Sequence, residues 1–104
     1  TQFIRLGSYC FLSAGAFANK DIPPFTIAEG HWARPRAVNR VALQRGGVSD
    51  SARRNIQLAT RTLLNSSLTI EAVCERIRAD CEADEHIEYI LEFLESSRSG
   101  VARR

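Results

Sequence analysis

The chain has 104 residues, of which 44% are hydrophobic and 25% are charged, with a formal net charge of +2 at pH 7. These values are those of one small soluble globular domain, and they exclude a disordered polar chain. The longest uncharged stretch, residues 6–19, is shorter and more polar than the roughly 20 apolar residues a membrane span needs, so a membrane span is excluded.

The first predicted element is a pair of six-residue units, residues 6–11 and 12–17, each of which opens with a leucine followed by a small residue. The glycines at positions 7 and 15 argue against a long helix. Units of this form are typical of a β-solenoid, in which each turn buries its aliphatic corner against the next turn. Two units cannot bury their faces alone, because such repeats need about three or more neighbours.

The second element is the run DIPPFTIAEG, residues 21–30. Each proline fixes φ near about −65° and lacks a backbone donor, and Pro24 also biases Pro23 toward extended geometry. We expect this corner to stop the solenoid and to direct residues 25–28 into a last strand. Gly30 is then expected to let the chain turn out into a helical region.

A short helix of about two to three turns is predicted between Pro35 and Arg45, closed by Gly46 and Gly47. It would act as a connector. The predicted organisation is therefore terminal β-solenoid coils over residues 1–30, a connector with a short helix over 31–47, and a three-helix domain over 48–104.

Three amphipathic helices follow, with apolar residues recurring at intervals of three and four. Their N-caps are predicted at Ser49 or Asp50, at Thr69 and at Asp84. Gly100 is expected to end the last helix, and the tail, residues 101–104, is expected to fray. The fold class is therefore mostly α.

Charge is distributed unevenly along the chain. Residues 31–61 contain seven arginines and one acid, whereas residues 69–95 contain nine acids and two arginines. Either these are solvated faces that partly complement each other within the fold, or the basic middle binds an anion. Nucleic acid is disfavoured as a partner, because no helix-turn-helix glycine, RNA-binding aromatic motif or zinc spacing accompanies the arginines.

The three cysteines, Cys10, Cys74 and Cys81, stand at apolar positions of periodic segments. This placement predicts buried free thiols and a cytoplasmic protein. Cys74 and Cys81 are two helical turns apart, but no histidine stands near enough in sequence to complete a metal site. We therefore expect neither a metal nor another cofactor.

The order of these features resembles the C-terminal part of the bacterial UDP-N-acetylglucosamine O-acyltransferases of lipid A biosynthesis, over essentially the whole chain. Three stretches carry the resemblance: DIPPFTIAEG, the pair Val38-Asn39 nine residues beyond its glycine, and LQRGGVS at residues 43–49. The resemblance implies about one to two coils of a left-handed parallel β-helix followed by a domain of three to four helices. It also implies a trimer with active sites between subunits.

Four site residues follow from the resemblance. Gln2 matches a glutamine near the bound substrate, and Ala14 matches a small-residue position that limits acyl-chain length. Asn39 matches an asparagine that contacts substrate, and Arg45 matches the first of an arginine pair on the donor or nucleotide side. From the residues alone, Asn39 is equally a local cap and Arg45 equally a cation that complements a helix C-terminus.

The sequence also departs from the family pattern. Val41 stands where the family commonly has a glutamate, Gly46 replaces the second arginine, and Thr1 replaces a histidine. The family's histidine base lies on a coil upstream of this sequence, and neither His31 nor His86 matches its position. No catalytic residue is therefore predicted.

Two functions remain open. The first is the C-terminal part of the acyltransferase, which contributes to binding of the acyl donor and nucleotide sugar and to assembly, and which is inactive alone. The alternative is a small free-standing module for oligomerisation or for binding an acidic protein such as acyl carrier protein. Both interpretations imply a homo-oligomer, because an unpaired coil edge is a template for association.

Overall fold

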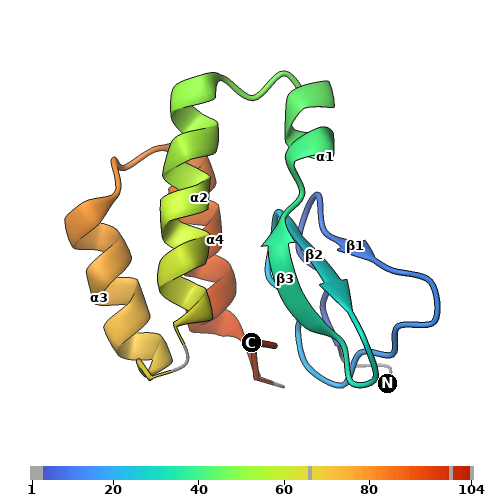
Figure 1. Cartoon of the computed structure of the whole chain (residues 1–104). Coiled ribbons are helices and arrows are strands. Elements are labelled where there is room, and N and C mark those ends of the chain that lie inside the picture. The colour runs from blue at the N-terminus through green and yellow to red at the C-terminus, as the bar shows by residue number, and fades with distance from the viewer. Residues whose placement is uncertain (1–3, 66, 99, 104) are drawn as a thin grey trace.

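The computed structural model describes residues 4–65, 67–98 and 100–103, which form four helices and a three-stranded sheet (Figure 1). The strands are β1 (Phe11–Leu12), β2 (Thr26–Glu29) and β3 (Arg34–Val38). The helices are α1 (Arg40–Arg45), α2 (Asp50–Leu64), α3 (Ile70–Asp80) and α4 (Glu85–Ser96). The predicted mostly helical class is confirmed. Within the described residues, no helix is long and apolar enough to cross a membrane.

The segments before and after the double proline lie side by side and run in the same direction. β1 pairs in parallel with β2, with Phe11 opposite Ile27, and Leu6 forms a parallel bridge with Ile22. In both pairs the partners are 16 residues apart in sequence. One turn of the chain is therefore laid directly on the next.

Residues 34–38 form a strand, so the prediction of a helix starting at Pro35 was wrong. β3 pairs antiparallel with β2 at the edge of the sheet, where a proline is tolerated. Arg34 and Arg36 are exposed while Pro35 between them is buried, which is the period of a strand. The free edge of β2 supplies backbone partners that an isolated short helix would lack.

The chain consequently leaves the sheet later than expected. β2 is not the last strand, and Gly30, with φ of 98°, enters the hairpin turn toward β3. The helical part begins at Arg40, behind Asn39 as N-cap. Gly46 and Gly47 follow the helix as predicted.

The three longer helices begin where the sequence predicts. Ser49, Thr69 and Asp84 are their N-caps, and each side chain accepts a hydrogen bond from the backbone N–H three residues on. α2 packs against α3, α4 and β3, as Figure 1 shows. Phe25, directly after the double proline, is buried in this helical core. The corner at the prolines thus joins the sheet to the helices.

The cysteines within this fold are free thiols. Cys74 and Cys81 are buried, as predicted, whereas Cys10 is only half-buried. Desolvation by burial raises the pKa of all three thiols above the usual value. They are therefore packing residues, because the reactive thiolate is disfavoured.

A buried carboxylate ties the N-terminal segment to α4. Asp21 is 1% exposed, and its Oδ1 accepts a hydrogen bond from the Arg5 backbone N–H at 2.9 Å. Its Oδ2 accepts from the Ser97 hydroxyl at 2.7 Å. The Arg5 guanidinium in turn donates to the Phe93 carbonyl at 2.9 Å. Because Ser97 turns toward Asp21, α4 ends at Ser96, and the expectation that Gly100 ends it was wrong.

The described part of the C-terminal tail, residues 101–103, is paired, so the expectation that these residues fray was wrong; Arg104 lies outside the described residues. The Asp21 N–H donates to the Gly100 carbonyl, and the Ala102 N–H donates back to the Asp21 carbonyl, both at 2.8 Å. Val101 and Ala102 are buried. The Arg103 guanidinium donates to the carbonyls of Leu63, Asn65 and Leu68. The bonds to Leu63 and Asn65 satisfy acceptors at the C-terminal end of α2 that the helix itself leaves unpaired, and the bond to Leu68 holds the link to α3.

Candidate functional site

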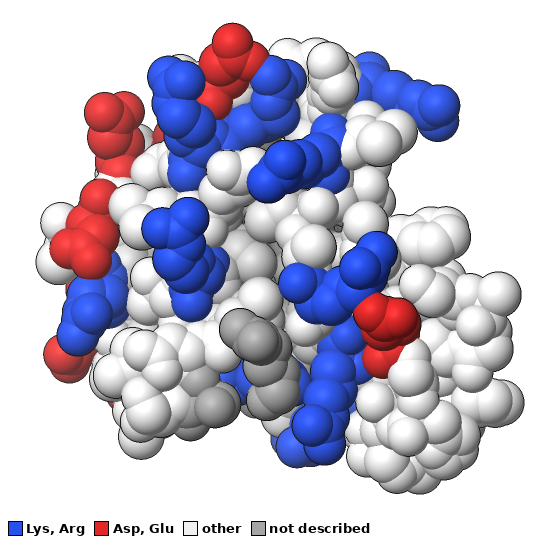
Figure 2. Space-filling model, viewed as in Figure 1, with Lys and Arg blue, Asp and Glu red and all other residues white. Residues whose placement is uncertain are grey.

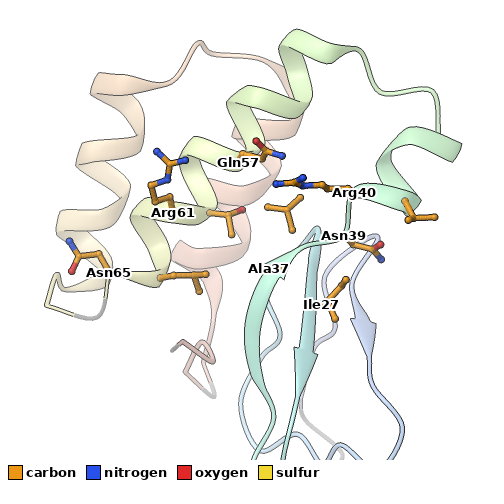
Figure 3. A pocket seen from close by; sticks show the side chains of 11 residues that line it. Ile27, Ala37, Asn39, Arg40, Gln57, Arg61 and Asn65 are labelled. Carbon is orange, nitrogen blue, oxygen red and sulfur yellow. The ribbon is translucent and has the colours of Figure 1, made fainter.

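A groove of about 980 Å³ lies between the β2–β3 hairpin, the start of α1 and one face of α2 (Figure 3). Its apolar lining is Ile27, Ala37, Val38, Val41 and Leu64. Its polar lining is Asn39, Arg40, Gln57, Thr60, Arg61 and Asn65. The lining contains two cationic side chains and no acidic one, so the groove is suited to a negatively charged ligand with an apolar part.

Basic side chains gather on the face that holds the groove. Figure 2 shows Lys and Arg side chains over α2 and the hairpin, with Asp and Glu side chains mainly toward α3. Among the ion pairs within the described residues, such as Arg36 with Glu29 and Arg78 with Glu95, none joins an arginine of residues 31–61 to an acid of residues 69–95. Of the two interpretations of the charge pattern, the groove favours an anion site.

Asn39 lies at the rim of this groove, but its side chain is already used within the fold. Its Oδ1 accepts a hydrogen bond from the Ala42 N–H at 3.3 Å, and its Nδ2 donates to the Tyr9 carbonyl at 3.0 Å. Asn39 therefore caps α1 and also fixes this helix against the N-terminal segment. The capping interpretation of Asn39 is thus present in the structure.

Arg45 is exposed in the last turn of α1, outside the lining of the groove. The next residue, Gly46, packs against the Tyr9 ring, and a Cβ at position 46 would lie 2.7 Å from the Tyr9 hydroxyl oxygen. A larger residue there requires Tyr9 to move. This contact explains why this chain accommodates glycine at the position where the resemblance expects a second arginine.

The other two predicted site residues do not join the groove. Ala14 is exposed in a turn beside Gly15, whose φ is 80°. Gln2 and also Thr1 lie outside the described residues. The structure therefore brings Asn39 to the groove, and places Ala14 and Arg45 elsewhere on the surface.

Both histidines pack against aromatic rings. The His31 ring lies 5.0 Å from the Phe17 ring, and the His86 ring lies 6.0 Å from the Phe25 ring, measured between centroids. The His86 Nδ1 is buried without a hydrogen-bond partner among the described residues. Neither histidine lines the groove.

The sequence patterns did not single out five of the six polar residues in the groove, namely Arg40, Gln57, Thr60, Arg61 and Asn65. Gln57, Thr60 and Arg61 recur at intervals of three and four along α2, so a search of its polar positions for helical spacing could have found them. Helical spacing could not have linked Arg40 to these residues, because Arg40 is on α1 and not on α2. Its position opposite α2 depends on the β2–β3 hairpin, where the sequence predicts a helix instead.

Comparisons with known proteins identify the family. The family model described as "Udp N-acetylglucosamine O-acyltransferase; Domain 2" matches residues 21–102. Two curated relatives, from Myxococcus xanthus and Alkalilimnicola ehrlichii, are 34% and 31% identical over 98% of this chain. Both are named acyl-[acyl-carrier-protein]–UDP-N-acetylglucosamine O-acyltransferase, and the chain spans 40% of the length of each.

A solved structure agrees in shape as well as in sequence. The crystal structure of LpxA, a UDP-N-acetylglucosamine acyltransferase from Bacteroides fragilis, is 33% identical and has a TM-score of 0.94, over 99% of this chain and 40% of that one. LpxA from Acinetobacter baumannii has a TM-score of 0.91 at 23% identity, which supports the fold alone. The resemblance found in the sequence is confirmed, and this chain belongs to the UDP-N-acetylglucosamine O-acyltransferase family.

Proposed function

We propose that this chain forms the terminal β-helix coils and the helical domain of a cytoplasmic UDP-N-acetylglucosamine O-acyltransferase. The observation that carries the proposal is the joint match in sequence and shape to Bacteroides fragilis LpxA over 99% of the chain. In this proposal residues 1–30 are the coils, 31–47 the connector and 48–104 the helical domain. The parallel pairs between the two turns, 16 residues apart at Leu6–Ile22 and Phe11–Ile27 and 14 apart at Phe17–His31, support the coils, because successive solenoid turns stack in parallel.

The proposed contribution of this chain is binding and assembly. By resemblance, Gln2, Asn39 and Arg45 contact the nucleotide sugar or the acyl donor, and Ala14 limits the length of the acyl chain. Arg45 supports this role because it is exposed and forms no ion pair with any described residue. In a trimer with sites between subunits, these surfaces would face a neighbouring copy.

We propose that the base for acyl transfer is not one of the two histidines of this chain. A general base must come within hydrogen-bond reach of the sugar hydroxyl that it deprotonates. His31 is exposed and packs against the rings of Phe17 and Trp32, with centroids 5.0 and 4.4 Å away, and the Nδ1 of His86 is buried. Neither histidine matches the position of the family's base. The chain alone is therefore expected to lack acyl transfer.

An acyl-transfer assay tests this proposal. With a 3-hydroxyacyl chain on acyl carrier protein as donor and UDP-N-acetylglucosamine as acceptor, the chain alone should give no product above background. A chimera in which it replaces the matched region of Bacteroides fragilis LpxA should be active, and Arg45→Ala in that chimera should raise KM by about tenfold, the loss of one charge-assisted contact. Arg76→Ala on α3 is the matched control. Turnover by the chain alone, or an inactive folded chimera, would contradict the proposal.

The alternative function, a module for oligomerisation or for binding an acidic protein, is favoured by a different observation. Leu6, Phe11 and Phe17 are 54–58% exposed, which is unusual for large apolar side chains. If they mediate self-association, the sedimentation coefficient should rise with protein concentration, and Phe11→Ser should reduce this rise. If the chain sediments as a monomer at every concentration, the proposed role in oligomerisation is wrong.

The proposed binding to acyl carrier protein has a separate test. This binding should weaken as the salt concentration rises, and binding that does not depend on salt would contradict it.

A further inference from the structure

We infer that the groove between the β2–β3 hairpin and α2 binds an anionic amphiphile, namely a single alkyl chain that ends in a phosphate or carboxylate group. This inference goes beyond the proposed function, because only Asn39 of the residues on which that function rests lines the groove, and Arg45 lies outside it. Asn39 contributes little to the chemistry of the groove, since both polar atoms of its side chain are bonded within the fold.

The charge of the expected ligand follows from the two arginines. Arg40 extends from the first turn of α1 toward α2, which carries Arg61 (Figure 3). Within the described residues, no carboxylate lies within the 4.0 Å of an ion pair from either guanidinium, and the groove lining has no acid. A guanidinium presents a planar fork of donors that matches phosphate and carboxylate oxygens. Both cations are therefore available for an anion.

Two uncharged polar side chains of α2 add hydrogen-bonding groups to the groove. Thr60 lines the groove on the same helix as Arg61. Its hydroxyl can donate a hydrogen bond to a ligand oxygen that Arg40 and Arg61 hold. Gln57, one turn earlier on the same helix face, adds a further donor.

The apolar part of the ligand follows from the floor of the groove. Ile27, Val38 and Leu64 line it, and Val41 forms a lip that is 58% exposed. Val41 stands where the resembled family commonly has glutamate, so this chain has an apolar side chain in place of an acid in a groove that two arginines line. The exchange removes repulsion of an anion and adds surface for an alkyl chain.

Calorimetric titration with n-decyl phosphate, kept below its critical micelle concentration, tests the inference. Neutral n-decyl maltoside shares the alkyl chain, and inorganic phosphate shares the head group. Decyl phosphate should bind at least about tenfold more tightly than either, since it alone uses both the guanidinium contacts and the apolar floor. In methyl NMR spectra, the signals of Ile27, Val38 and Leu64 should shift on titration.

Variants assign the effect to the groove. Arg40→Gln and Arg61→Gln should each weaken decyl phosphate binding by about tenfold, and Val41→Glu should abolish it. Thr60→Val should weaken it without changing the affinity for decyl maltoside. Arg76→Gln, which removes an exposed cation of α3 outside the groove, is the matched control. Arg40, Val41 and Arg61 are exposed, so these variants should keep the native circular dichroism spectrum.

Three results would overturn the inference. The first is equal affinity for decyl phosphate and decyl maltoside, and the second is equal affinity for decyl phosphate and inorganic phosphate. The third is that Arg40→Gln and Arg61→Gln behave like Arg76→Gln. Because these measurements use binding by the chain itself, they are independent of acyl transfer by the chimera, and either proposal can fail without the other.

Discussion

Replacing Asp21 by alanine should lower the free energy of unfolding by about 2–4 kcal/mol, because each donor that is left without its acceptor costs about 1–3 kcal/mol. The substitution leaves the Ser97 hydroxyl and the Arg5 N–H without their acceptor in a site that is 1% exposed. A domain of this size has about 5–15 kcal/mol of stability in total, so the loss is a large fraction of it. Urea denaturation followed by circular dichroism measures the change.

Glu29→Ala is the control for the Asp21 variant. Glu29 pairs with Arg36 at 3.1 Å, but both side chains are more than half exposed. Exposed ion pairs contribute about 0–1 kcal/mol, so this variant should unfold at nearly the wild-type urea concentration. If the two variants were equally stable, the carboxylate of Asp21 would not be what holds the N-terminal segment to α4.

Gly7→Ala should destabilise the protein by about 3 kcal/mol, because the site has no room for a Cβ atom. A Cβ at position 7 would lie less than 3.0 Å from the backbone nitrogen and Cα of Pro24, and a backbone cannot move aside as a flexible side chain can. Gly7 is also hydrogen-bonded through its N–H to the Ile22 carbonyl at 2.9 Å. The thermal unfolding midpoint of the variant measures the loss.

Gly15→Ala is the control for Gly7→Ala, because it measures the cost of a positive φ at a position that has room for a Cβ atom. Position 15 has a positive φ of 80°, and a Cβ there would meet no atom within 4 Å, so only the left-handed backbone is penalised, by about 1–2 kcal/mol. Gly7→Ala should therefore be the more damaging change. The reverse order would show that the Gly7 segment can move away from Pro24 at little cost.

The contacts of Gly7 and Asp21 show how the corner at the double proline is held in the fold. Pro23 and Pro24 are buried, and their lack of N–H donors costs nothing where no acceptor faces them. Gly7 lets the preceding turn of chain lie directly against Pro24, while Asp21 just before the prolines binds Arg5, Ser97 and the C-terminal tail. The corner thus places Phe25 in the helical core and holds the sheet against α4.

The parts of the fold that depend on local sequence were predicted correctly. Ser49, Thr69 and Asp84 were predicted as N-caps, and the helices behind them follow from apolar spacing. The family followed from short motifs, since DIPPFTIAEG and LQRGGVS each combine a backbone constraint with a fixed spacing. For the site, the excess of arginine in residues 31–61 indicated an anion surface.

The errors occurred where distant segments supply the partners. Residues 34–38 form a strand because β2 offers a free edge, and residues 100–102 are ordered because Asp21 offers an N–H and a carbonyl. The groove itself requires α2, which carries Thr60 and Arg61, to lie beside the hairpin that leads to Arg40. The sequence by itself determined caps, helical periods and family, because these depend on residues a few positions apart. Tertiary structure decided the hairpin, the tail and the groove, because their hydrogen bonds and packing join residues that are far apart in the chain.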